Sequence, residues 1–122
     1  MANIGGNITG VIQTKKTGWV NEIGEKESKW VDAFTFPGFL DMQSGDSKYT
    51  NFNAKIEEST HIFLCDFHSG VYALSMPDAK NKVPETRMII KGMVYDVLLI
   101  DNPMEMDEQL EIYLRKVGAW NG

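Results

Sequence analysis

Four side chains that could bind a metal ion lie close together in the sequence: His61, Cys65, Asp66 and His68. Imidazole, thiolate and carboxylate groups are the usual ligands of zinc, and a zinc site needs three or four of them that converge. The segment has the composition of a strand, and successive side chains of a strand point to opposite faces. His61 and Cys65 would then share one face while Asp66 and His68 point to the other. We therefore predict no metal site here.

A second candidate is an acidic run, Asp101, Glu105, Asp107 and Glu108, which could suggest calcium. The run lacks the spacing and the glycine of an EF-hand loop, so we interpret it as a solvated turn between two strands. No phosphate-binding, nucleophile-elbow or zinc-protease motif is present, and two histidines with one cysteine offer few nucleophile–base pairs. An enzyme built from these dispersed groups is the weakest hypothesis. We predict no catalytic residues and no cofactor.

The elements that must position any functional residue belong to a small, mildly acidic protein. The chain has 122 residues and a net charge of −5, which suits one domain and argues against a reader of duplex DNA. The last 22 residues hold five acids and two bases and so supply −3 of that charge. The single cysteine, Cys65, excludes an intrachain disulfide. We expect neither a secretory signal nor a membrane association, because no apolar run approaches the roughly 18 residues of a spanning helix.

Hydrophobic patterning predicts about six strands. A tight hairpin, with Lys91-Gly92 as its turn, is expected over 86–101, and Asp101-Asn102-Pro103 should end its second arm. Residues 109–117 alternate between inward Leu110, Ile112 and Leu114 and outward polar side chains, although a helix over 104–115 is the competing interpretation. The other strand candidates are 7–17, 29–42 and 55–67.

The predicted connections are long. Residues 17–28 are expected to be a loop or wide hairpin connection, 43–53 a polar loop with room for one helical turn, and 68–84 a second irregular stretch. Pro37-Gly38 should mark an edge, bulge or bend, since proline cannot donate into a central ladder. The predicted fold is mainly all-β: a small antiparallel barrel, or failing that a sandwich, with long loops and at most one short helix. We expect one domain over 1–122, with flexible ends at 1–6 and 118–122.

Aromatic residues supply the candidate contacts to other proteins. Trp30 lies in an apolar strand and is expected to be core, whereas Trp19 and Trp120 lie in polar or glycine-containing surroundings. An exposed tryptophan is a natural interface anchor, although one that folds back on the barrel is an equal alternative. Tyr113, on the outward face of the last strand, joins Trp19 and Trp120 as a predicted interface residue.

The order of these features resembles the phage head–tail joining family, also called head-closure or stopper proteins. The resemblance spans about Ile8 to Leu114, and its most specific piece is the hairpin with Arg87, Gly92 and Tyr95-Asp96-Val97. It departs from the family pattern at Val71–Val83, where a short connection is usual. The segments that carry it are Ile8-Thr9-Gly10-Val11-Ile12-Gln13, Glu22-Ile23-Gly24-Glu25, Trp30-Val31-Asp32, Leu40-Asp41, Ser44-Gly45, Ser59-Thr60-His61-Ile62, Arg87 to Val97, Asp101-Asn102-Pro103 and Leu110-Glu111-Ile112-Tyr113-Leu114.

This resemblance implies a structural protein of a tailed phage or prophage. The subunits would form a ring beneath the portal and adaptor, close the DNA-filled capsid and offer a surface to the tail. An isolated subunit could be a monomer that associates only on assembly. The implied location is the virion, and the host cytoplasm during assembly. The loop after the second strand would face the ring lumen and alone contact the packaged DNA; the residues we expect there are Gln43, Asp46, Lys48, Tyr49 and Asn51.

One alternative function remains open. A small barrel of SH3-like or oligonucleotide-binding type could take a peptide or single-stranded nucleic acid on one face. Such a module would want an aromatic and basic stripe on one sheet. The aromatic candidates Phe63, Tyr95 and Tyr113 have few bases nearby in the sequence.

Overall fold

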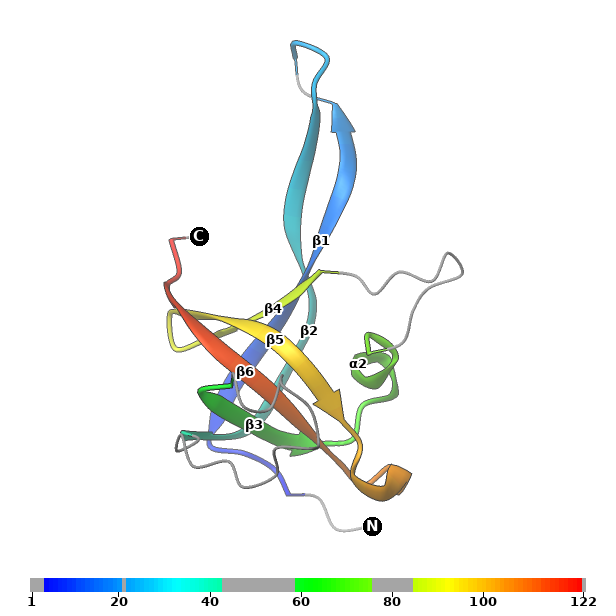
Figure 1. Ribbon diagram of the computed structural model, residues 1–122, viewed down its shortest axis with the longest axis vertical. Coiled ribbons are helices and arrows are strands. Elements are labelled where there is room, and N and C mark those ends of the chain that lie inside the picture. Colours follow the sequence, from blue (N-terminus) through cyan, green and yellow to red (C-terminus); the bar gives the residue numbers. More distant parts are fainter. Residues whose placement is uncertain (1–3, 21, 43–58, 76–84, 122) are drawn as a thin grey trace.

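The computed structural model describes residues 4–20, 22–42, 59–75 and 85–121, with only the backbone described at 17–19, 26 and 27. Its strands pair antiparallel in the order β1-β2-β3-β6-β5-β4, and β4 pairs again with β1, so the sheet closes into a barrel. The predicted small all-β barrel is confirmed (Figure 1). The strands are β1 (Ile8–Val20), β2 (Lys26–Met42), β3 (His61–Asp66), β4 (Thr86–Ile90), β5 (Met93–Asp101) and β6 (Gln109–Ala119).

Alternating side chains of the strands fill the barrel. Leu110, Ile112 and Leu114 of β6 are fully buried, as their period-2 pattern predicts. Phe63 of β3 is also fully buried, and its ring meets that of Phe36 edge to face at 5.8 Å between centroids. The remaining fully buried side chains in the described chain come from β1, β3, β4 and one short helix: Ile12, Cys65, Met88, Ile90 and Val71.

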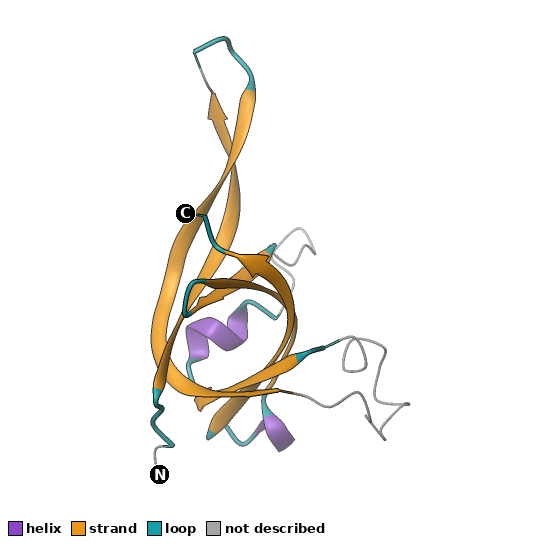
Figure 2. Ribbon diagram, turned by 90° about the vertical axis from the view of Figure 1, so that its left-hand side faces the viewer, coloured by secondary structure: helices purple, strands orange, loops and turns teal. Residues whose placement is uncertain are grey.

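One end of the barrel is covered by the helix α2 (Ser69–Ala73), which Figure 2 shows across the opening. Val71 of this helix is fully buried in the core, and Tyr72 and the following Leu74 pack against it. The helix lies within the stretch 68–84 that the sequence predicted to be irregular. It is the single α-helix among the described residues, which matches the expectation of at most one short helix.

The β4–β5 hairpin forms as predicted. Lys91 and Gly92 have φ of 48° and 74°, the two left-handed positions that a type I′ turn requires. Gly92 adopts this conformation without the penalty that a Cβ would bring. β5 ends at Asp101, as expected, and a single turn of 3-10 helix, η1 (Pro103–Glu105), leads toward β6.

Strand β2 runs through Pro37-Gly38 without a break. At Pro37 it pairs with β1 alone among the described residues, because its pairing with β3 begins at Phe39. The predicted edge position of the proline is therefore confirmed. Gly38 has another role: a Cβ there would overlap the Phe63 ring and lie 2.5 Å from the Leu64 carbonyl oxygen. The absence of a side chain lets β3 approach β2.

Two sequence-based expectations were wrong in their extent. Residues 17–28 are not a loop, since β1 continues to Val20 and β2 begins at Lys26 around a short turn. Gly18 is absorbed as a β-bulge, because Thr17 pairs with Ser28 and Trp19 with Glu27. Within the strand predicted over 55–67, β3 spans His61–Asp66, and residues 59, 60 and 67 are not part of it; residues 55–58 lie outside the described part of the chain.

Candidate functional site

The most prominent surface feature is a β-ribbon that projects from the barrel, which we call the arm: Lys15–Val20 of β1, Lys26–Trp30 of β2 and turn residues 22–25. β1 pairs with β4 from Gly10 to Thr14, and the Lys15 N–H still donates to the Glu85 carbonyl oxygen at 3.0 Å; beyond Lys15, within the described part of the chain, β1 and β2 pair with each other alone. Six residues of strand extend about 20 Å. Figure 1 shows the arm standing clear of the barrel. Near its tip Val20 and Ile23 are 65% and 77% exposed.

The foot of the arm is fixed by polar and cation–π contacts. The guanidinium of Arg87 lies 4.3 Å from the centre of the Trp30 ring, and the Lys15 ammonium lies 5.8 Å from it. Arg87 Nε donates to Gln13 Oε1 at 2.8 Å, and Gln13 Nε2 donates to Asp32 Oδ1 at 2.8 Å. The prediction that Trp30 belongs to the core was wrong, because the ring is only partly buried and stacks on Arg87 outside the barrel.

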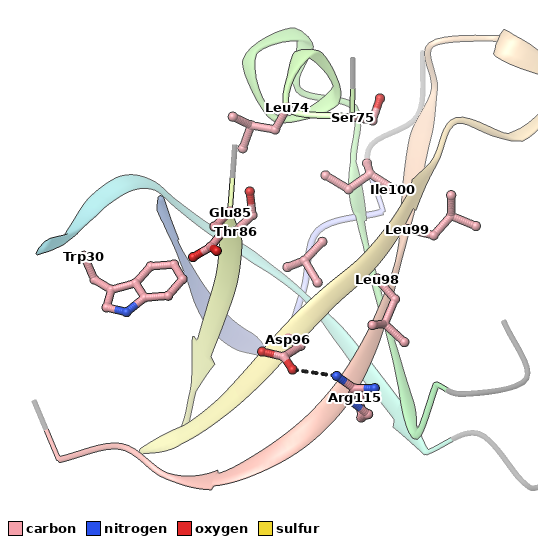
Figure 3. Close-up of a pocket in the computed structure, with 11 residues that line it drawn as sticks. Trp30, Leu74, Ser75, Glu85, Thr86, Asp96, Leu98, Leu99, Ile100 and Arg115 are labelled. Carbon is pink, nitrogen blue, oxygen red and sulfur yellow. Dashed lines mark hydrogen bonds and ion pairs between the residues drawn. The ribbon is translucent and has the colours of Figure 1, made fainter. Parts of the chain in front are cut away.

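A groove of about 610 Å³ opens beside the foot of the arm (Figure 3). It begins where the β4–β5 pairing ends, at Arg87 opposite Asp96, while β5 continues to Asp101. Two of its charged residues form an ion pair, with Asp96 Oδ2 and Arg115 Nη2 2.9 Å apart. The rest of its wall is mixed: the apolar residues are Trp30, Leu74, Val97, Leu98, Leu99 and Ile100, and the polar ones are Ser75, Glu85 and Thr86. Such a groove can hold an apolar or extended segment; its lining includes no nucleophile paired with a base.

The turn between β5 and β6 holds an unusual backbone. Met104, Glu105 and Asp107 all have positive φ, between 52° and 57°. Asn102 is 4% exposed and clamps the turn: its Nδ2 donates to Asp107 Oδ1 at 2.7 Å, and its Oδ1 accepts from the Asp107 N–H at 3.1 Å. Strained backbone persists only when the surroundings hold it in place. The clamped turn leaves Met104 and Met106 88% and 57% exposed.

The histidine, cysteine and aspartate residues near β3 do not converge. Cys65 is fully buried inside the barrel, whereas Asp66 accepts the N–H groups of Ile4 and Gly5 at 2.7 and 3.2 Å. The His61 ring packs at 5.1 Å from Tyr95, and the His68 ring at 5.1 Å from Phe36. Burial and the nearby Lys116 lower the pKa of His61. Within the described residues, no three His, Cys, Asp or Glu side chains are grouped so as to hold a metal ion.

Burial makes Cys65 chemically inert in the folded barrel. Burial, with a smaller effect of the Asp66 charge, raises the pKa of its thiol from 9.0 to about 12. At pH 9 only about one thiol in a thousand would then be a thiolate, the form that attacks disulfide reagents. We expect Ellman's reagent at pH 7–9 to label the native protein only at the rate of global unfolding, and the urea-unfolded chain at once. Fast labelling of the native protein that accelerates with pH would contradict this placement.

The predicted interface residues lie on different elements. Trp19 is in the arm, opposite Glu27, and its side chain is outside the described part of the structure. Tyr113 is on β6, where its hydroxyl donates to Glu111 Oε1 at 3.0 Å; burial and Glu111 raise the pKa of this phenol. Trp120 follows β6 and is 41% exposed.

The predicted lumen residues Gln43, Asp46, Lys48, Tyr49 and Asn51 all lie outside the described residues. The described chain does fix where this connection starts and finishes. Met42 ends β2 and pairs with His61 at the start of β3, so the two ends of the β2–β3 connection lie side by side on neighbouring strands.

Sequence reasoning missed the arm's length, the groove and the clamped turn. The two register shifts in the β1–β2 pairing, at Ala33 of β2 and Gly18 of β1, gave no separate signal in the sequence. The Asn-Pro step before an acidic run did indicate a turn, but not its left-handed backbone.

Comparison with known proteins found no protein-family model that matches the chain and no curated protein that is similar to it. A scan of the described helices found none with the length and hydropathy to span a membrane.

Proposed function

We propose that the chain is a structural connector protein of a tailed phage or prophage. Its subunits form a ring at the head–tail connector, which closes the DNA-filled capsid and provides the surface to which the tail docks. The protein acts by assembly rather than catalysis, in the host cytoplasm and then in the virion. Portal, adaptor and tail proteins are its partners.

The observation that carries this proposal is the closed barrel with its projecting arm. A two-stranded ribbon is at best marginally stable alone in water, so an arm about 20 Å long gains stability from contact with another protein. Ring symmetry then multiplies such contacts, because each bound neighbour raises the effective concentration of the next. The isolated subunit can therefore be monomeric and still assemble on a portal.

The sequence segments that carry the family resemblance, taken in their order along the chain, also fit a barrel. Ile8–Gln13 lies on β1, Trp30–Asp32 on β2 and Leu110–Leu114 on β6, while the Arg87–Val97 segment forms the β4–β5 hairpin. These segments occupy strands and a tight turn rather than the surface of a catalytic cleft. They support a common scaffold, on which the connections supply the contacts.

The direct test is assembly on a portal. Purified protein mixed with a portal–adaptor complex should add a ring of density at the complex's open end, seen by negative-stain electron microscopy.

Deleting Gly45–Asn51 should leave the barrel folded and the ring in place but let packaged DNA escape from particles, because this segment is the proposed lumen loop. Particles of the deletion variant that still retain DNA would contradict the proposal that this segment holds the DNA in the capsid. If the intact protein adds no ring to the portal–adaptor complex, the connector function itself is contradicted.

The groove supports a second candidate function, a module that binds an extended peptide. Its wall offers Leu98, Leu99 and Leu74 beside a strand that loses its β4 partner, which is the arrangement that strand addition uses. Single-stranded nucleic acid is the poorer ligand, since Trp30 is the one aromatic residue in the lining and already stacks on Arg87. Saturable chemical-shift changes at Leu98 and Leu99 on titration with an apolar extended peptide would favour this candidate.

A further inference from the structure

The two ends of the β5–β6 hairpin carry opposite charges. Residues 101–111 contain five acids and no base, whereas 86–95 and 112–122 each contain two bases and no acid. Because Asp101 pairs with Glu111 and Met93 with Ala119, the acidic β5–β6 turn lies at one end of the strand pair, and the Lys91-Gly92 turn and the residues after Lys116 lie at the other. Eight residues of strand separate them, about 26 Å. Figure 1 shows the β5–β6 turn and the C-terminus at opposite sides of the barrel.

The acidic end presents exposed methionines on a fixed frame. We call Asn102–Glu108 the acidic methionine turn. The Asn102 clamp holds its left-handed residues in place, so Met104 and Met106 project from a defined backbone while Glu105 and Glu108 are exposed beside them. Methionine is flexible and polarizable, and it is common at protein-binding surfaces.

The opposite end is basic and carries exposed apolar groups. We call Lys91, Gly92 and Lys116–Trp120 the basic tryptophan end. The Trp120 N–H donates to the Gly92 carbonyl oxygen at 2.8 Å, which ties the tryptophan to the turn that carries Lys91. Val117 and Trp120 are 61% and 41% exposed, and Lys91 and Lys116 are exposed as well.

We propose that the acidic methionine turn of one copy binds the basic tryptophan end of a second copy. Opposite charges steer the two surfaces together and fix their orientation, while the methionine side chains cover the Trp120 ring, a contact that sulfur and aromatic groups favour. The two surfaces differ, so the contact is heterologous: every copy uses one end for each neighbour, and the chain of copies closes into a ring if the rotation permits. This inference deepens the proposed function by naming the subunit interface of the ring.

Charge reversal gives a reciprocal test. K91E/K116E makes both ends acidic, and E105K/E108K makes both ends basic. Each variant alone should self-associate at least about tenfold more weakly than the wild type in sedimentation velocity, because like charges now meet. An equimolar mixture should recover association, since each variant then finds its complement. Equal association by all three proteins, or no recovery in the mixture, would overturn the proposal.

Two controls separate this result from misfolding and from a general charge effect. D41K reverses the charge of an exposed β2 residue that belongs neither to the two ends nor to the arm, and it should leave self-association unchanged. All variants should keep the wild-type circular dichroism spectrum and thermal midpoint. Raising the salt from about 50 to about 500 mM should weaken association of the wild type, as screening requires.

Cysteine pairing tests the contact without altering charge. M104C and W120C lie at opposite ends of the barrel, too far apart for a disulfide within one molecule. Buried Cys65 provides little background. Under mild oxidation, a mixture of the two variants should form the mixed disulfide dimer in preference to either homodimer. A preference for M104C–M104C or W120C–W120C dimers would show an isologous interface and overturn the proposal.

Failure of this inference can be told apart from failure of the connector function. If the charge-reversed variants still form a ring on the portal–adaptor complex, the interface assignment is wrong while the function stands. If wild-type copies associate through these ends but add nothing to the portal complex, the interface is right and the connector function is wrong.

Discussion

Replacing Phe63 with alanine should lower the free energy of unfolding by about 3–5 kcal/mol, the usual cost of emptying a fully buried aromatic position. Phe63 of β3 has no exposed surface, and its ring meets Phe36 and the position of Gly38 on β2 and the position of Gly10 on β1. Removing it therefore leaves a cavity bordered by three strands. Urea unfolding followed by circular dichroism measures the loss.

The matched control for this variant is Phe39→Ala. Phe39 is 37% exposed, so the same truncation should cost about 1 kcal/mol or less. Similar losses for the two variants would mean that Phe63 is not the centre of the barrel core. A variant that fails to fold at all would agree with a loss at the upper end of the expected range for so small a domain.

The second large effect is expected at Gly38, where alanine should cost about 3 kcal/mol. The added Cβ would overlap Phe63 and approach the Leu64 carbonyl oxygen to 2.5 Å, so β2 and β3 would have to separate where their pairing begins. The backbone oxygen cannot rotate away as a flexible side chain can. Chemical unfolding again gives the measurement.

Gly118→Ala supplies the comparison at a glycine of β6. Nothing lies within 4 Å of the position that its Cβ would take, so we expect a change within about 0.5 kcal/mol. A neutral Gly38→Ala variant would show that β3 does not approach β2 as closely as described.

The parts of the fold that could be predicted are those where local pattern and tertiary packing agree. Lys91-Gly92 meets the backbone demands of a tight turn, and Leu110, Ile112 and Leu114 alternate because β6 has one face inside the barrel. The period-2 pattern also predicted correctly that the side chains of Cys65 and Asp66 lie on opposite faces of β3. In these segments the sequence pattern shows which face of the strand points into the barrel core.

The arm could not be read in the same way because neither of its faces contributes to the barrel core. A ribbon that projects into solvent shows no alternation, and its Gly18 resembles a loop residue although the strand absorbs it as a bulge. Trp30 misled for a related reason: a large aromatic residue in an apolar strand is usually core, but here two cations cover it from outside. Hydrophobic content alone does not tell those environments apart.

The groove and the polarity of the β5–β6 hairpin depend on relations between distant segments. The groove exists because β4 begins at Thr86 while β5 extends five residues past the last β4 pair, and strand ends are the least certain part of any sequence-based prediction. The acidic run was visible, and its interpretation as a solvated turn agrees with the structure. That bases lie at the other end of the same strand pair follows only from the register.

The pairing of β1 with β4 has a consequence for the order in which the protein folds. It joins residues 72 to 80 positions apart, from Thr14 with Thr86 to Gly10 with Ile90. During synthesis on a ribosome β1 and β2 can pair early. The other edge of β1 can pair with β4 only after more than half of the chain has emerged. Such long-range contacts slow folding into the millisecond-to-second range. During that interval the nascent hairpin has an open edge that can bind other unfinished chains, so lower synthesis temperature should raise the yield of native protein.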